Sequence, residues 1–236
     1  MSGRTGAAGA PVITIDGPSG TGKGTLRTRL ASRLGFHMLD SGALYRALAC
    51  RVLDTGTDPG DATAVARLAG ALPIAFEPAA DETGVAILLD GVDVTGRVRE
   101  ETVGSLASLV AQIPEVRAAL LELQRDCRRP PGLVADGRDM GTVVFPEADF
   151  KLYLTASPET RAQRRHNQLK AKGIGGSLSQ LFADIQARDQ RDSARTAAPM
   201  RPAHDAIVMD TSELTIDEVT ARVEALLAER GLVRSP

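Results

Sequence analysis

Residues 12–25 read VITIDGPSGTGKGT, and they carry the clearest indication of the fold in the chain. Its first five residues are rich in β-branched side chains and predict a buried strand, while a helical pattern begins at about residue 23. The glycines between them let successive backbone N–H groups turn toward a chain of phosphates, and the helix N-terminus adds positive potential. The stretch therefore predicts a phosphate-binding P-loop, in which Lys23 reaches the β- and γ-phosphates.

The loop departs from the general pattern in the position of its hydroxyl. Gly24 follows Lys23, and the hydroxyl comes one place later, at Thr25. We therefore expect Mg²⁺ to be held mainly by the nucleotide phosphates and water, and no residue is assigned as a metal ligand. The loop alone does not separate kinases from other nucleotide hydrolases. The predicted donor-site residues here are Gly17, Pro18, Ser19, Gly20, Thr21, Gly22, Lys23, Gly24 and Thr25.

Further along the chain, short apolar runs alternate with longer helical patterns. Such runs fit parallel strands that are buried on both faces and joined by helices. The sequence thus predicts an α/β fold, a P-loop parallel sheet of about five strands flanked by helices. The other strands are expected at 133–136, 151–154 and 206–210, with a weaker candidate at 36–39. Helices are expected at about 23–34, 42–55, 61–71, 100–112, 115–128, 158–172, 177–190 and 215–230.

Two segments interrupt this alternation. Between 73 and 99, Asp90-Gly91 separates apolar runs and is a strong hairpin turn, so a small antiparallel insertion is expected. Three glycines in residues 173–176 predict a hinge beside a short helical lid. The expected division is a disordered tail at 1–11, core at 12–72 with the P-loop and the start of the acceptor site, the insertion at 73–99, core at 100–156, the lid at 157–176 and core at 177–236.

The bulk composition excludes several classes of protein. Of 236 residues, 43% are hydrophobic and 25% charged, and the net charge is −2, so the chain as a whole has no electrostatic attraction to nucleic acid or an anionic membrane. No run approaches the roughly 18 apolar residues of a membrane span, and the first eleven residues lack the apolar segment of a secretory signal. Cys50 and Cys127 lie far apart, which predicts neither a disulfide nor a zinc site. A cytoplasmic location is expected.

Two further segments carry polar groups to the same predicted edge of the sheet. LDSGALYR at 39–46 offers a hydroxyl, a phenol and a guanidinium, with Ser41 as the expected helix N-cap and Arg46 able to match a phosphate. DGRDMGT at 136–142 follows another strand, and its charges are costly unless they meet a ligand. For residues 39–46, the plain alternative is an ordinary capped helix with a surface arginine. For residues 136–142, it is a charged turn held by its own Asp/Arg pairing.

Arginines are dense in the C-terminal third. Arg161, Arg164 and Arg165 share one helical face, and Arg188, Asp192 and Arg195 form a second stripe. Such runs are commonly solvated faces. A transferring phosphoryl group, however, needs cations to offset the charge on its oxygens, which favours a functional interpretation.

Together, GPSGTGKGT, LDSGALYR, PEVR and LVADGRDMGTVVFP resemble the bacterial cytidylate kinases, P-loop nucleoside monophosphate kinases; the likeness is weakest at 55–100 and in the tail. The resemblance implies in-line transfer of the γ-phosphoryl group of ATP to CMP or dCMP, giving CDP or dCDP and ADP, with Mg²⁺ and arginine charge stabilisation. It also implies a monomer that binds neither nucleic acid nor membrane.

The resemblance assigns roles to individual residues. Ser41, Tyr45, Arg46 and Arg138 would lie at the acceptor and its phosphate, whereas Ser108, Arg117 and Asp139 would read the cytosine edge. Arg188 and Asp192 would hold the ribose, Arg195 would meet phosphate, and Arg161 and Arg165 would contact ATP from the lid. The catalytic residues would be Lys23, Arg138, Arg188 and Arg195.

Two other functions remain open on the sequence. The first is a uridylate, thymidylate or small-metabolite kinase that uses the same loop. The second is a nucleotide-dependent switch with slow hydrolysis, although the chain contains no Asn-Lys-x-Asp guanine-reading motif.

Overall fold

The computed structural model describes residues 9–78, 85–171, 173, 175–195 and 197–232. Residues 1–8 of the expected tail, 79–84 of the expected insertion and positions 172 and 174 near the expected hinge lie outside the described residues. At the start of the described part, the Ala10 carbonyl accepts a hydrogen bond from Arg128 Nε at 2.7 Å.

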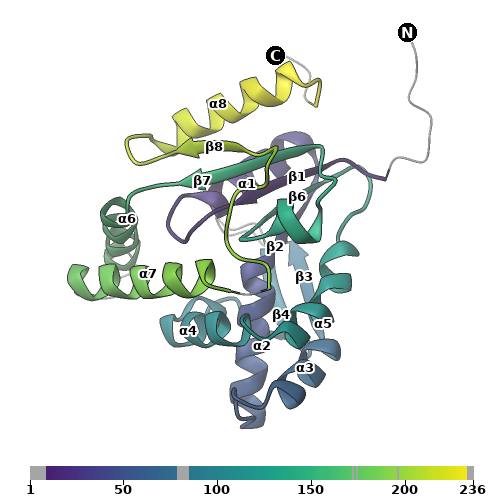
Figure 1. Ribbon diagram of the computed structural model, residues 1–236, viewed down its shortest axis with the longest axis vertical. Helices are drawn as coiled ribbons and strands as arrows, with labels where there is room; N and C mark the ends of the chain where they lie inside the picture. Colours follow the sequence, from purple (N-terminus) through teal and green to yellow (C-terminus); the bar gives the residue numbers. More distant parts are fainter. Residues whose placement is uncertain (1–8, 79–84, 172, 174, 196, 233–236) are drawn as a thin grey trace.

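A parallel sheet of five strands forms the centre of the molecule, as the sequence predicts (Figure 1). The spatial order is β2-β6-β1-β7-β8. The strand that precedes the P-loop is therefore central, and all five of its residues are buried, which is why it is so apolar. The strands are β1 (Val12–Asp16), β2 (His37–Asp40), β6 (Leu133–Gly137), β7 (Phe150–Thr155) and β8 (Ile207–Asp210).

Helices cover both faces of this sheet. On one face, Leu26 and Leu30 of α1 (Lys23–Leu34) pack with Val223 of α8 (Ile216–Glu229) against alternate residues of β1 and β7. On the other face, Leu44 of α2 (Ser41–Thr55) packs with Phe145 against β1 and β6. Within the described residues, no helix combines the length and apolar character needed to cross a bilayer.

A second core is built around α2, below the parallel sheet in Figure 1. The hairpin predicted at Asp90-Gly91 is confirmed: both residues have positive φ, 51° and 76°, and Leu89 pairs with Val92 across the two-residue turn. The elements here are α3 (Ala62–Gly70), the antiparallel strands β3 (Ile74–Pro78), β4 (Val85–Leu89) and β5 (Val92–Asp93), a 3₁₀ turn at Arg97–Arg99, α4 (Glu101–Val110) and α5 (Pro114–Arg125).

Two helices, α6 (Pro158–Ala171) and α7 (Leu178–Ser193), lie side by side next to the sheet (Figure 1). Helix α7 continues three residues beyond the predicted end at 190. This extension places Arg188 and Asp192 on one helical face, near the carboxyl ends of the strands.

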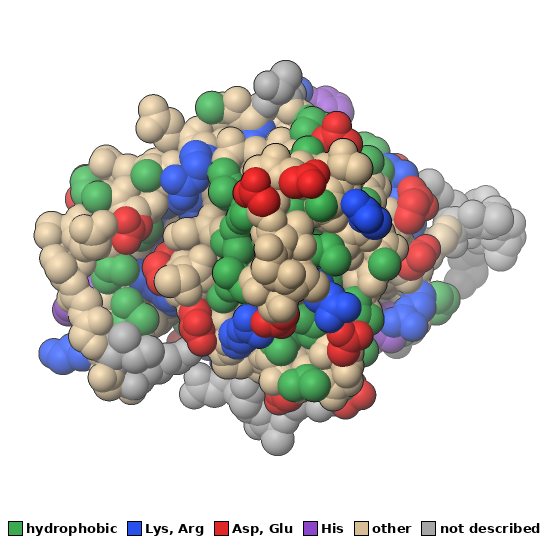
Figure 2. Space-filling view, turned by 90° about the horizontal axis from the view of Figure 1, so that it is seen from below, with side chains coloured by type: hydrophobic (Ala, Val, Ile, Leu, Met, Phe, Trp, Pro, Cys, Tyr) green, Lys and Arg blue, Asp and Glu red, His purple; other side chains and the backbone are tan. Residues whose placement is uncertain are grey.

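The outer surface carries both signs of charge. Figure 2 shows acidic and basic side chains mixed among hydrophobic ones on the lower face of the molecule. Some of these charges are paired at the surface: Arg97 lies 2.6 Å from Asp54, and Arg51 lies 2.6 Å from Asp90. Exposed pairs of this kind contribute little to stability, typically about 0–1 kcal/mol each.

Candidate active site

The P-loop joins the carboxyl end of β1 to α1, and its glycines allow close packing. Gly17 has a φ of 136°, and a Cβ placed there would lie 2.0 Å from the carbonyl oxygen of Leu154 on β7. Gly20 has a φ of 83°, and a Cβ there would meet the Arg161 side chain at 2.9 Å. Both positions therefore require glycine, because another residue would be strained and would also displace a neighbouring element.

The Lys23 side chain lies folded across the loop that precedes it. Its ammonium donates to the Pro18 carbonyl at 2.5 Å, and only 6% of the residue is exposed. Burial, together with the positive charges of Arg138 and Arg188, lowers the pKa of Lys23 to about 7. A buried lysine surrounded by other cations is arranged to meet an anion.

Helix α6 presents its three arginines to different surroundings. Arg161 is buried behind the loop, where it donates to the Ser19 carbonyl at 3.2 Å and pairs with Asp189 at 2.5 Å. Arg164 donates to the carbonyl groups of Thr211 and Leu214 and ties α6 to the segment before α8. Arg165 lines the cleft and pairs with Glu101 of α4 at 3.1 Å. Of the two lid arginines predicted to contact ATP, Arg165 therefore lines the cleft, while Arg161 supports the loop.

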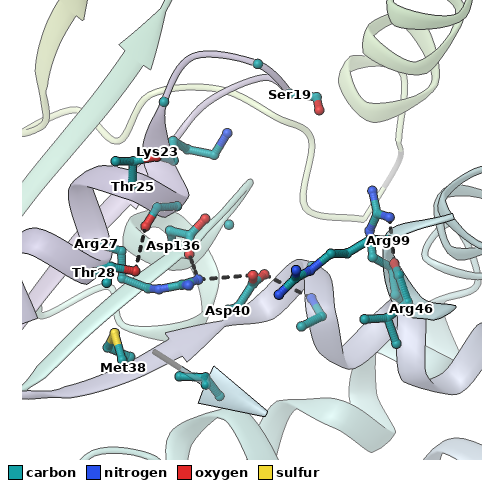
Figure 3. A pocket seen from close by; sticks show the side chains of 18 of the residues that line it. Ser19, Lys23, Thr25, Arg27, Thr28, Met38, Asp40, Arg46, Arg99 and Asp136 are labelled. Atoms are coloured by element: carbon teal, nitrogen blue, oxygen red, sulfur yellow. Dashed lines mark hydrogen bonds and ion pairs between the residues drawn. The ribbon is translucent and has the colours of Figure 1, made fainter. Parts of the chain in front are cut away.

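A cleft of about 460 Å³ lies in front of the P-loop (Figure 3). Lys23 lies on the loop side of it, and Arg46 and Arg99 lie across from Lys23. A second pocket of about 50 Å³ is lined by Ser41, Tyr45, Ser108, Arg117, Asp139, Asp192 and Arg195, and by four residues that also line the cleft, Gly42, Gly137, Arg138 and Arg188. All the residues predicted for the acceptor thus line either the cleft or the pocket beside it.

The expectation that Ser41 caps α2 is wrong. Asp40 is the N-cap, since it has an extended backbone and its Oδ1 accepts from the Ala43 N–H at 2.9 Å. Ser41 begins the helix, and its hydroxyl donates to Gln124 Oε1 of α5 at 2.9 Å. The hydroxyl is thereby placed at the wall of the small pocket.

The small pocket ends in a buried ion pair. Arg117 of α5 donates to Asp139, which follows β6, and its guanidinium lies 5.8 Å from the centre of the Tyr45 ring. Burial raises the pKa of Asp139, while the charges of Arg117 and Arg195 oppose that shift. The alternative in which Asp136 and Asp139 pair with Arg138 in their own turn is wrong, because Asp136 pairs with Arg27 and Asp139 with Arg117.

Asp192 gathers the arginines at the junction of the two pockets. It accepts from Arg138 Nε at 2.9 Å and from Arg195, and Arg188 Nε lies 4.0 Å away. Although burial opposes ionisation, these cations hold the pKa of Asp192 below its usual value. Ser108 donates to the same carboxylate at 3.5 Å.

Positive charge exceeds negative charge at this junction. Burial, together with repulsion by Arg138 and Arg46, lowers the pKa of Arg188 to about 9. Among the described residues, the Nε atoms of Arg188 and Arg195 are buried without a hydrogen-bond partner. An anion bound here would supply the missing partners and relieve the repulsion.

Three side chains that contact and hold residues of the candidate site were not identified from the sequence. Asp16 accepts from the backbone N–H groups of Met140 and Gly141 at 2.8 Å each and so fixes the turn that carries Asp139. Arg27 contacts Asp40 and Asp136, and Gln124 holds Ser41. A signal existed for Arg27, since it lies four residues after Lys23 and therefore on the same helical face.

Comparison with known proteins identifies relatives across nearly the whole chain. The family model described as cytidylate kinase matches residues 13–229. The chain is 55% identical over 223 residues to the cytidylate kinase of Pseudomonas savastanoi pv. phaseolicola, covering 94% of this chain and 97% of that protein. It is 56% identical over 209 residues to the cytidylate kinase of Methylococcus capsulatus, covering 89% and 93% of the two chains.

Proposed function

Because the chain belongs to the cytidylate kinase family, we propose that the wide cleft holds ATP at the P-loop, and that the small pocket holds the cytosine base of an acceptor whose phosphate reaches into the cleft. The enzyme transfers a phosphoryl group from ATP to CMP, and we include dCMP as a second acceptor. The observation that carries this division is the group of arginines around Asp192, which lies where the two pockets meet.

On the donor side, residues 17–25 wrap the triphosphate with backbone N–H groups. When ATP binds, the Lys23 ammonium leaves the Pro18 carbonyl and donates to phosphate oxygens. The negative phosphates raise the lowered pKa of Lys23, so that the ammonium is fully protonated. Arg165 reaches the phosphates from α6, which acts as the lid within residues 157–176. Closure of such a lid excludes water, which would otherwise accept the phosphoryl group.

The residues present fit a magnesium ion that is held by the nucleotide. In the described part of the chain, no three His, Cys, Asp or Glu side chains are grouped to hold a metal ion. Thr25 lines the cleft, whereas both oxygens of Asp16 already accept backbone hydrogen bonds. Mg²⁺ bound with ATP would supply charge neutralisation at the β- and γ-phosphates.

On the acceptor side, the Arg117–Asp139 pair reads the base. Cytosine carries an N4 amino donor where uracil carries an O4 acceptor. The Asp139 carboxylate can accept from the first and repels the second, and Arg117 and Ser108 offer donors to the remaining polar edge. Arg46, Arg138 and Ser41 hold the acceptor phosphate, and Arg188 and Asp192 hold the ribose.

Transfer itself requires positioning and charge compensation rather than a covalent intermediate. The phosphoryl group passes in line between two oxygens while charge spreads over its other three oxygens. Arg138 and Arg188, which line both pockets, and Arg195, which lines the small one, offset this charge together with Lys23. We further propose that the enzyme acts as a monomer in the cytoplasm; its two cysteines are free thiols.

The test is an ADP-release assay with CMP, dCMP, UMP, AMP, GMP and dTMP, and with no acceptor. We expect CMP and dCMP to be preferred and turnover without acceptor to be marginal, whereas a nucleotide switch would hydrolyse ATP alone.

Asp139→Ala tests the base-reading role in the same assay. The variant should lower the CMP:UMP ratio of kcat/KM by about tenfold or more, since the cytosine amino group loses its acceptor. Asp126→Ala, which removes an exposed carboxylate, is the control. An unchanged ratio in Asp139→Ala would remove the base-reading role.

A further inference from the structure

Two carboxylates lie side by side on the floor of the cleft. Asp40 is the last residue of β2 and Asp136 the next-to-last residue of the neighbouring parallel strand β6, and their Cα atoms are paired in the register of the two strands. Their side chains therefore emerge on the same face of the sheet, and both line the cleft. Adjacent like charges are unfavourable, and here they also face the space in which two polyanionic substrates meet.

One guanidinium contacts both carboxylates. Nη1 of Arg27 lies 2.5 Å from Asp136 Oδ1 and 3.0 Å from Asp40 Oδ2, as the dashed lines in Figure 3 mark. The arginine is only 6% exposed and stands one helical turn after Lys23. Lys23 contributes a second, more distant positive charge toward Asp136, and Arg46 does the same toward Asp40.

Arg27 also connects three parts of the active site. Its own helix, α1, begins with the P-loop lysine. Through Asp40, whose other oxygen caps α2, it holds the helix that carries Ser41 and Arg46. Through Asp136 it holds the end of β6, two residues before Arg138. A single side chain thus links the donor loop to two segments of the acceptor site.

From this geometry we infer that Arg27 is a positioning residue for phosphoryl transfer: it neutralises Asp40 and Asp136 beneath the substrate phosphates and fixes the acceptor helix relative to the P-loop. Arg27 acts through the two aspartates rather than on the reacting atoms. The inference rests on the proposed division of the cleft between ATP and CMP.

The two parts of this role predict different kinetic effects. Loss of the charge leaves two carboxylates to repel the substrates and should raise KM for both nucleotides. Loss of the ion pair between Arg27 and Asp40 lets α2 shift relative to α1. This shift should lower kcat, since a misplacement of about 1 Å can lower the rate roughly 100-fold. A purely structural ion pair would lower thermal stability and leave the kinetic constants of the folded enzyme unchanged.

The experiment compares Arg27→Met with the double variant Arg27→Met/Asp136→Asn. The double variant restores the local net charge of wild type, but not the ion pairs that link α1 to α2 and β6. We expect Arg27→Met to lower kcat/KM for CMP by about 10- to 100-fold. The double variant should return both KM values to within about threefold of wild type while kcat stays reduced. Arg29→Met is the matched control, because Arg29 lies on the same helix and pairs with the exposed Asp217; its constants should stay within about twofold.

Thermal unfolding of each variant establishes which proteins are folded. A folded Arg27→Met with wild-type constants would overturn the inference, and so would a double variant whose KM values stay as high as those of Arg27→Met. If Arg27→Met does not fold, the double variant carries the test, and KM values more than about tenfold above wild type would reject the charge role. Wild-type enzyme in the same assay separates this result from the proposed function, which fails only if wild type does not phosphorylate CMP.

Discussion

Several side chains in the site are held in charge states that their surroundings oppose. Lys23 and Arg188 are buried cations beside other cations, and the pKa of each is lowered, to about 7 and about 9. Asp16 is a buried carboxylate whose pKa is raised to about 7 by burial, against two backbone N–H donors that favour its ionised form. The largest cause is the same for all three residues: burial removes the side chain from water and disfavours its charged form.

Asp16 leads to a prediction about pH and stability. Its folded-state pKa, about 7, lies above the ordinary value of 3.8, so the folded protein binds this proton more tightly than the unfolded chain does. The contribution of Asp16 to the free energy of unfolding is therefore full below about pH 4 and falls as the pH rises to about 7. Asp16→Asn lacks this titration. Its free energy of unfolding, relative to wild type, should rise by about 2–4 kcal/mol between pH 4 and pH 7.

Urea denaturation at several pH values between 4 and 7.5 measures this difference. The exposed Asp126→Asn serves as the control. A constant difference between Asp16→Asn and wild type across this range would contradict the prediction. The absolute stability of Asp16→Asn is a separate quantity, because the amide can accept only one of the two backbone hydrogen bonds through its oxygen.

At the scale of elements, the proposed lid contacts the opposite wall of the cleft. The ion pair between Arg165 of α6 and Glu101 of α4 spans the two helices at 3.1 Å. Both side chains are partly exposed, at 29% and 50%, so the pair is weak and can exchange for a stronger partner. Arg165 must leave Glu101 if it is to meet the phosphates of ATP.

Glu101→Gln should therefore lower KM for ATP, because Arg165 no longer has to give up a carboxylate. An exposed pair contributes about 0.2–1 kcal/mol, which corresponds to a change of up to about fivefold. Steady-state kinetics with saturating CMP measures the effect, with Glu122→Gln as control, since Glu122 pairs with Arg125 on α5. The effect should vanish when Arg165 is replaced by Ala. A rise in KM for ATP in Glu101→Gln would refute the exchange.

At the scale of the whole molecule, two hydrophobic cores meet at the site. One core lies between α1, α8 and the parallel sheet, and the other joins α2, α3, α4, α5 and the antiparallel strands. The small pocket draws Asp139 from the segment after β6, Asp192 from α7, and Ser108 and Arg117 from helices α4 and α5 of the second core. Its geometry therefore depends on both cores being well packed.

Leu120 tests the second core, because it is fully buried on α5 between Arg117 and Gln124. Leu120→Ala should destabilise the protein by about 2–5 kcal/mol through lost burial and the cavity it leaves. For a chain of this size, we expect Tm to fall by roughly 5–15 °C. Leu53→Ala, where the side chain is 50% exposed on α2, should change stability by less than about 0.5 kcal/mol. Scanning calorimetry of both variants measures these changes in stability. Equal losses of stability in the two variants would show that the second core does not contribute as described.

Much of the fold was predictable because its signals are local. The strand-loop-helix order around Lys23 and the Asp90-Gly91 turn each depend on a few neighbouring residues with defined backbone preferences. The candidate acceptor residues were also predictable, since Ser41, Arg46 and Asp139 follow strands whose carboxyl ends meet at one edge of a parallel sheet. Motif resemblance supplied the roles that were then assigned to them.

The class of fold, the phosphate-binding loop and the set of polar residues around the cleft could all be predicted from the amino-acid sequence. Only the tertiary structure decided which charges are partners: Arg27 with Asp40 and Asp136, Arg117 with Asp139, and Arg161 behind the loop while Arg165 lines the cleft. The physical reason is that turns and periodic patterns are encoded in neighbouring residues, whereas an ion pair between residues 27 and 136 depends on strand register and helix placement set by the packing of the whole core.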